Sequence, residues 1–82
     1  MTMTKDDVRN WLANRFAQDL KVSPDQVPLD VNFDRVGLDS LTLLTILADL
    51  SDHLDQELQT SLLMDHPNID RLASHLGSDQ TN

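Results

Sequence analysis

Residues 39–54 read DSLTLLTILADLSDHL, and the hydrophobic period of a helix runs through them. At about 100° per residue, one face of a helix collects every third or fourth apolar side chain. That face would carry Leu43, Leu47, Leu50 and Leu54, flanked by Leu44 and Ile46. Asp39 precedes the pattern, and aspartate is one of the residues that cap helix N-termini. We therefore expect a helix from about Ser40 to Leu54.

The opposite face of this expected helix is polar. Within an arc of about 80° it would present Thr42, Thr45, Asp49 and Asp52. Two of these four side chains are acidic, so the helix combines a buried apolar face with a mildly acidic exposed one.

Two other main helices are expected, one upstream and one downstream. Thr4 and Asp7 match a capping box, and a core stripe follows at Val8, Leu12, Phe16 and Leu20. After that helix, Ser23–Pro24 can begin only a single turn, because a second proline follows closely. Asn68 can cap the last helix, which Gly77 closes.

The remaining segments predict a short helix and a long loop. Thr60 or Ser61 can cap a short helix that Pro67 terminates. Residues 29–39 show no sustained period, only isolated apolar anchors, and Gly37 near their end favours a tight turn. With no convincing strand, the sequence predicts an all-α fold: a small four-helix bundle of three main helices and one short helix. A long structured loop joins the first two helices.

Composition limits the classes of function. The chain has 82 residues, no cysteine and a formal net charge of −8. This length fits one domain, which we place at residues 1–77, followed by a flexible tail at 78–82. The lack of cysteine excludes disulfides and a cysteine nucleophile, and the negative charge argues against nucleic acid or an anionic membrane as main partner. With no run of roughly 18 apolar residues, we expect a soluble, cytoplasmic monomer.

The negative charge is concentrated in one part of the chain. Residues 36–70 contain seven acidic residues and no Lys or Arg, whereas residues 1–35 have a net charge of −1. Inside the acidic part, residues 40–48 carry no charge at all.

Patterns of catalysis and metal binding are incomplete. The Gly-x-Ser-x-Gly motif of hydrolases is absent, and the three histidines lack the paired spacing of metal ligands. Residues 30–34 copy the first three ligand positions of a calcium loop, but Arg35 and Leu41 stand where that loop needs glycine and glutamate. The sequence does not indicate a free-standing catalyst.

Ser40 is the remaining candidate for chemistry. It lies at the start of an expected helix, where backbone amides and the helix dipole favour an anion such as a phosphate. On this local argument alone, a polar first-turn residue beside the Asp39 cap is the better explanation of Ser40.

A wider pattern resembles acyl carrier proteins. The segments that carry it are SPDQV at residues 23–27, FDRVGLDSL at 33–41 and SLLMDHPNIDRLASHL at 61–76. The last segment is similar to the LLFDHPT…LA-HL ending of carriers from polyketide synthases. The resemblance covers about residues 8–76, in register with the expected helices.

The resemblance implies a four-helix bundle without catalysis of its own. Ser40 would be the attachment point for 4′-phosphopantetheine, transferred from coenzyme A by a separate magnesium-dependent phosphopantetheinyl transferase. Asp39 would assist that transferase and its metal as well as cap the helix. The thiol of the arm would carry acyl groups as thioesters between an acyltransferase or acyl-loading ligase and a ketosynthase or other pathway enzyme.

Departures from the family pattern concern the partner face. Carriers of fatty-acid synthesis usually have acidic residues where Thr42 and Thr45 stand, so contacts to partners would shift to Asp49 and Asp52 or to apolar contact through Leu41. Peptidyl carriers typically show GG(H/D)S at the serine. Residues 36–39 of this chain, VGLD, fit the pattern of acyl carriers better. Met64, in place of a common Phe, is interpreted as a packing change. The leucine stripe would be ordinary core, or else line a gap for the acyl chain.

These observations favour a discrete carrier of a polyketide-type pathway. A domain excised from a larger synthase, a fatty-acid-type carrier and an aminoacyl or peptidyl carrier remain as alternatives. So does an acidic helical interaction module without a prosthetic group.

Overall fold

The structure is a computed structural model, and it describes residues 3–77. Its regular elements are α1 (Lys5–Leu20), the 3-10 turns η1 (Pro24–Gln26) and η2 (Phe33–Arg35), α2 (Ser40–Leu54), α3 (Leu62–Asp65) and α4 (Ile69–Leu76). Within the described residues the elements are all helical, with three longer helices and one short one. The predicted all-α bundle is confirmed.

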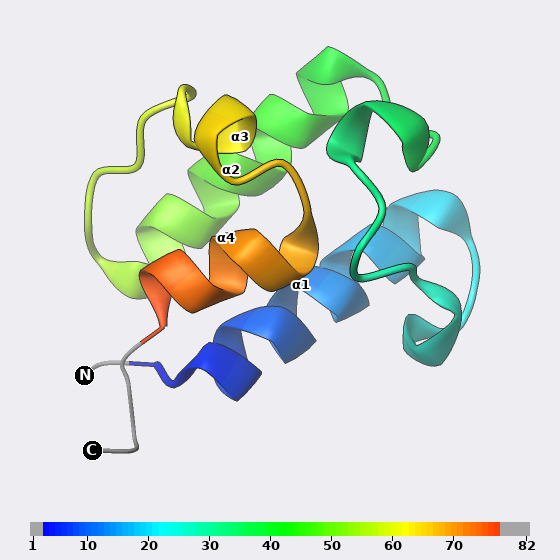
Figure 1. Cartoon of the computed structure of the whole chain (residues 1–82), viewed down its shortest axis with the longest axis horizontal. Coiled ribbons are helices and arrows are strands. Elements are labelled where there is room, and N and C mark those ends of the chain that lie inside the picture. The colour runs from blue at the N-terminus through cyan, green and yellow to red at the C-terminus, as the bar shows by residue number, and fades with distance from the viewer. Residues whose placement is uncertain (1–2, 78–82) are drawn as a thin grey trace.

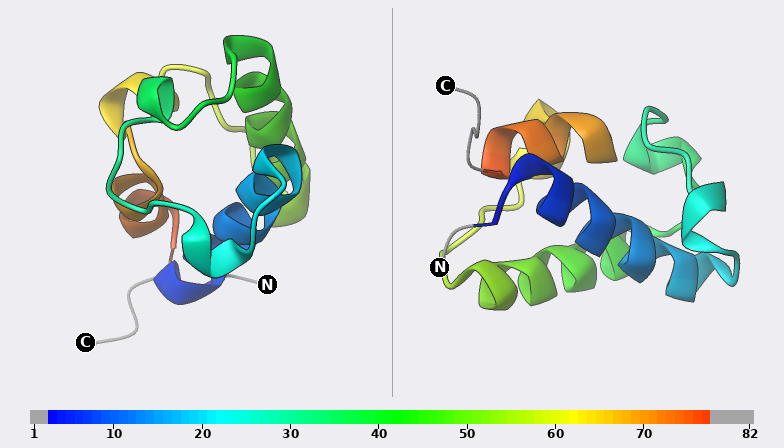
Figure 2. Two further views of the ribbon diagram at one scale, coloured as in Figure 1. Left: turned by 90° about the vertical axis from the view of Figure 1, so that its right-hand side faces the viewer. Right: turned by 90° about the horizontal axis from the view of Figure 1, so that it is seen from below.

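Helices α1, α2 and α4 form the bundle. Figure 2 shows α1 beside α4 on one side and α2 on the other, with α1 and α2 running in opposite directions. Two ion pairs join these helices: Arg9 of α1 contacts Asp70 of α4 at 3.4 Å, and Arg15 of α1 contacts Asp49 of α2. The short α3 lies beside α2 and near α4 (Figure 1).

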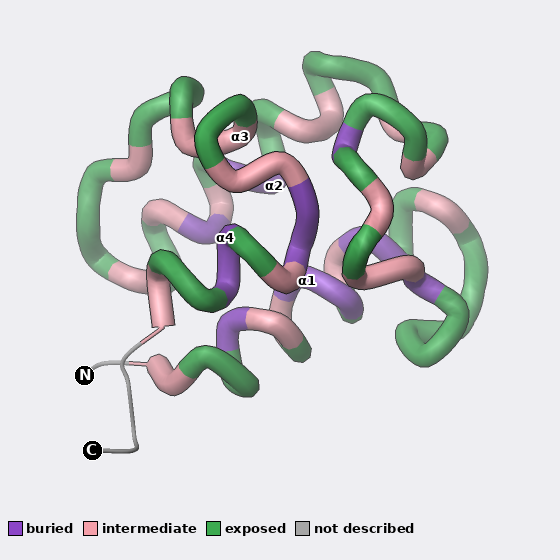
Figure 3. The backbone as a smooth tube through the Cα atoms, viewed as in Figure 1, coloured by how far each residue is buried: buried purple, intermediate pink, exposed green. Residues whose placement is uncertain are grey.

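The core lies where the three helices meet (Figure 3). Its largest fully buried side chains are Phe16, Leu12, Leu50, Ile69, Leu72 and Val8. Trp11 is partly buried, as expected for an indole whose N–H needs a polar partner, and its ring stacks on His53 with centroids 5.6 Å apart. The predicted core stripe of α1 is confirmed, with Leu20 partly buried at its end.

The core stripe of α2 differs in detail from the prediction. Ile46, expected at the flank, is buried with Leu47 and Leu50. Leu43 and Leu54, expected in the stripe, are only partly buried. The fully buried residues of α2 thus lie in the middle of the helix, and its first and last turns are less deeply packed.

The loop between α1 and α2 contains η2, a turn that the sequence did not predict. Phe33 in η2 is buried and packs against Phe16, with ring centroids 5.6 Å apart. The Phe33 amide donates to the Pro67 carbonyl at 2.7 Å, which ties the loop to the start of α4. A three-residue turn has no period to detect, so these long-range contacts define it.

The two glycines act in different ways. Gly37 has a φ of +108°, which confirms the predicted tight turn before α2. Gly77 follows α4 as predicted but has a φ of −77°, so it is not a left-handed cap. A Cβ at Gly77 would lie 2.3 Å from Cα of Lys5, so glycine is required there by the close approach of two backbones.

Caps largely match the sequence. Thr4 and Asp7 form the predicted capping box of α1, and Asn68 caps α4 by accepting the Arg71 amide at 2.8 Å. Ser61 stands at the cap position of α3, but its side chain makes no capping bond. The predicted tail at 78–82 lies outside the described residues. No helix in residues 3–77 is long and apolar enough to cross a membrane.

Candidate functional site

Ser40 is the first residue of α2 and is exposed to solvent. The preceding Asp39 has an extended backbone, and its carboxylate accepts the Thr42 amide at 2.8 Å. The amides of Ser40 and Leu41 belong to the first turn, whose N–H groups have no acceptor within a helix. The hydroxyl of Ser40 therefore stands at the positive end of a fifteen-residue helix.

Asp39 stays ionised beside this hydroxyl. Hydrogen bonds from the backbone and then the side chain of Thr42 lower the pKa of Asp39 below its ordinary value. The carboxylate and the helix dipole thus stabilise one another at the end of α2. A negative charge next to Ser40 suits recognition by a protein that brings a divalent cation.

A groove of about 710 Å³ opens beside Ser40. It is lined by Asn32, Phe33, Asp34, Leu38, Asp39, Ser40, Leu43, Leu44, Thr60, Leu63, Met64 and Pro67. The elements that contribute these residues, η2, the start of α2 and α3, surround the same end of the bundle (Figures 1 and 2). The groove has the size of a small-molecule site, and seven of its twelve lining residues are apolar.

Exposed apolar side chains gather around this groove. Leu41 is 74% exposed, Met64 is 83% exposed and Leu44 is 40% exposed. The interpretation of Met64 as a packing substitution is wrong, because the side chain lies on the surface of a one-turn helix. This exposure makes Met64 a functional candidate that the sequence did not reveal.

The predicted partner face of α2 is only partly free. Thr45 and Asp52 are exposed, whereas Thr42 and Asp49 are half-buried. Arg15 of α1 contacts the Asp49 carboxylate and also lies 3.7 Å from Asp19. The expectation that all four polar side chains lie on one exposed arc is therefore corrected: α1 covers the edge that carries Asp49.

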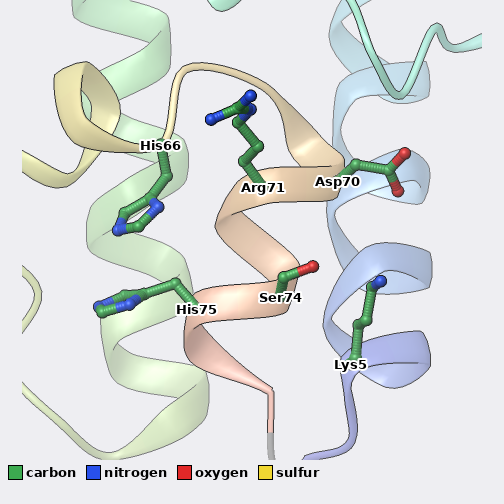
Figure 4. A pocket seen from close by; sticks show the side chains of 6 residues that line it. All are labelled: Lys5, His66, Asp70, Arg71, Ser74 and His75. Carbon is green, nitrogen blue, oxygen red and sulfur yellow. The ribbon is translucent and has the colours of Figure 1, made fainter.

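A second hollow of about 420 Å³ lies along α4 and is lined by Lys5, His66, Asp70, Arg71, Ser74 and His75. The imidazoles of His66 and His75 stack with centroids 4.2 Å apart. Figure 4 shows that Lys5, Arg71 and Ser74 point in different directions and not toward a common centre. Residues 3–77 contain no group of three His, Cys, Asp or Glu side chains that could hold a metal ion.

Comparison with known proteins identifies the family. Residues 10–76 match the family described as phosphopantetheine attachment site. The chain belongs to this family of carrier domains. The expected resemblance to acyl carriers is confirmed, and 4′-phosphopantetheine is the prosthetic group of the family.

Individual relatives of this carrier agree. Acyl carrier protein TtuC of Teredinibacter turnerae is 39% identical over 51 residues, which are 62% of this chain and 59% of TtuC. A non-reducing polyketide synthase of Byssochlamys spectabilis is 35% identical over 60 residues, 73% of this chain and 3% of the synthase. The chain thus spans less than two thirds of either relative.

The fold has a close counterpart among solved structures. Asl1650 is an acyl carrier protein from Anabaena sp. PCC 7120 with a variant phosphopantetheinylation-site sequence. It superposes with a TM-score of 0.86 and 36% identity, over 90% of this chain and 84% of that chain.

Proposed function

We propose that Ser40 is the residue to which 4′-phosphopantetheine is attached and that the chain carries acyl groups of a polyketide-type pathway. The observation that carries this proposal is the position of Ser40. Its exposed hydroxyl stands at the N-terminus of α2, inside the family match and at the edge of a groove with room for an arm.

The residues around Ser40 fit the group. The groove leaves one side of the serine open, and the first-turn amides of α2 and its dipole favour the phosphate that would be attached there. Among the residues that line the groove, Asp34 and Asp39 are the charged ones, and both are acidic. The phosphate is therefore held by the helix terminus and by solvent, not by a cationic side chain.

Attachment is a substitution at phosphorus. The oxygen of Ser40 forms a bond to the β-phosphorus of coenzyme A, the bond from that phosphorus to the bridging oxygen breaks, and adenosine 3′,5′-bisphosphate leaves with that oxygen. The hydroxyl proton passes to a base of the transferase, because no histidine lines the groove. Asp39 would assist that enzyme and its magnesium ion.

The arm supplies a thiol, on which acyl groups are carried as thioesters. Ser40 then acts as a tether, and the chain presents the group to enzymes that act in trans: the phosphopantetheinyl transferase, an acyltransferase or acyl-loading ligase, and a ketosynthase. Leu41, Thr42, Thr45 and Asp52 are its contact residues, with Asp49 at their edge. A cytoplasmic location is part of this proposal, and it is supported by the need for such partners and for coenzyme A.

The test is modification in vitro. The protein is incubated with coenzyme A, magnesium and a broad-specificity phosphopantetheinyl transferase, and its intact mass is measured. We expect the mass to rise by that of one arm in the wild type and in Ser74→Ala, which removes an exposed serine of α4. Ser40→Ala should stay unmodified. No increase in the wild type, or an increase in Ser40→Ala, would refute the proposal.

A further inference from the structure

The interior of the bundle has almost no free space. A cavity in its core has a volume of about 10 Å³ and is lined by Leu12, Phe16, Phe33, Leu43, Ile46, Leu47, Leu50, Leu63 and Leu72. That volume is about the smallest that can hold one water molecule. An acyl chain could enter only by displacing close-packed side chains, which forces them out of their preferred rotamers.

The groove outside the bundle is about seventy times larger. Ser40 lies on the groove and not on the interior cavity. Three side chains line both spaces, Phe33, Leu43 and Leu63. They form the wall between them, and Phe33 in that wall is buried and packed against Phe16.

We propose that the group carried on Ser40 lies in this outer groove and does not enter the bundle. This inference rests on the proposed attachment at Ser40. The apolar part of the carried chain would contact Leu44, Leu63 and Met64, which leave carbon surface open to solvent in the unloaded protein. Covering that surface is the source of affinity.

The polar side chains of the groove define the class of chain. Asn32, Asp34 and Thr60 line it and provide amide, carboxylate and hydroxyl groups. A fully reduced alkyl chain would cover these groups without bonding to them, which is unfavourable. A chain that bears a hydroxyl group can bond to them. The groove therefore favours a short, oxygen-bearing acyl group over a saturated one of equal length.

The site of the carried group is tested by NMR. Isotope-labelled protein is loaded with an octanoyl or a 3-hydroxyoctanoyl arm, and intact mass establishes first that loading is complete. We expect nuclear Overhauser effects from the chain to the methyl groups of Leu44, Leu63 and Met64, and none to Ile46 or Leu50. Contacts to Ile46 or Leu50, or contacts to neither set, would overturn the inference. Failure of loading would instead count against the proposed function.

The preference for an oxygen-bearing chain is tested with one hydroxyl. Hydroxylamine cleaves the thioester and releases the free thiol, so the rate of thiol release measures how far the protein shields the thioester of each arm. The rate for the octanoyl arm is divided by the rate for the 3-hydroxyoctanoyl arm, and this ratio is compared among variants. Thr60→Val should reduce that ratio by about fivefold, the value of one net hydrogen bond.

Thr45→Val is the matched control for this ratio. Its hydroxyl already donates to the Leu41 carbonyl at 2.9 Å and does not line the groove, so the ratio should not change. A wild-type ratio near one, or equal effects of the two variants, would show that the groove does not select oxygen-bearing chains.

Discussion

Asp39 connects the helix terminus to the attachment site. Its carboxylate accepts the amide of Thr42, and this bond lowers its pKa. The same charge stands at the positive end of α2, where an anion is stabilised. A fixed negative charge beside the Ser40 hydroxyl is thus a consequence of the helix cap.

The lowered pKa predicts a specific dependence on pH. A carboxyl whose pKa is lower in the folded state stabilises the fold above its unfolded pKa, and this contribution is lost as the pH falls through the folded pKa. In Asp39→Asn the amide still caps the helix but does not titrate. We expect the wild type to be more stable than Asp39→Asn at neutral pH, and the difference to be lost as the pH falls through the lowered folded pKa, below the ordinary value of 3.8.

Thermal unfolding followed by circular dichroism, over a series of pH values, measures this difference. Asp25→Asn is the control, because Asp25 is an exposed acid inside η1 and does not occupy its cap position. A difference between wild type and Asp39→Asn that does not change with pH would show that the ionised carboxylate contributes nothing beyond the amide.

Local signals explain which residues of the site were predicted. The cap at Asp39 and the position of Ser40 depend on neighbours within three residues, so the sequence was sufficient. The pair between Arg15 and Asp49 joins residues 34 positions apart on two helices, and no local pattern contains it. Met64 was misjudged because a single turn of helix has no period from which to read an exposed face.

At the scale of elements, the start of α4 holds the long loop in place. Asn68 accepts the Arg71 amide, the Asp70 amide donates to the Leu29 carbonyl at 3.0 Å, and the Phe33 amide donates to the Pro67 carbonyl. The helices themselves were predictable from their periods and caps. The path of the loop was not, because these bonds connect segments far apart in the sequence.

This arrangement predicts unequal effects at two cap positions. Asn68 is buried and bonded, so Asn68→Ala should lower the free energy of unfolding by about 1 kcal/mol. For a domain of this size, that corresponds to a loss of about 4–8 °C in Tm. Ser61→Ala should change stability by less than about 0.5 kcal/mol, because its side chain makes no capping bond.

Urea denaturation followed by the fluorescence of Trp11, the single tryptophan of the chain, measures both variants. Equal losses at the two positions would mean that the Asn68 bond does not stabilise α4. No loss at either would mean that the loop holds α4 in place without its cap.

At the scale of the whole molecule, the acidic charge of the chain is less available than the sequence indicates. Residues 36–70 carry seven acids and no Lys or Arg, but two arginines of α1 form ion pairs with acids of this segment. Arg15 contacts Asp49, and Arg9 contacts Asp70. On α2 itself, the exposed apolar side chains near Ser40 are Leu41 and Leu44, and Asp52 lies about three turns further along the helix.

We therefore expect two separable contributions to partner binding, an apolar contact and an electrostatic attraction. Leu41→Ser removes an exposed apolar side chain beside Ser40 and should slow arm transfer by the transferase equally at low and high salt. Asp52→Lys should slow it by about two- to fivefold at low salt and less at high salt, because screening weakens exposed charges. Asp49→Lys places a cation beside Arg15 and should mainly reduce stability, by less than about 1 kcal/mol. Intact mass gives the rate of arm transfer at two salt concentrations, and the Tm of each variant shows any loss of stability. Unchanged rates in both Leu41→Ser and Asp52→Lys would show that partners dock elsewhere.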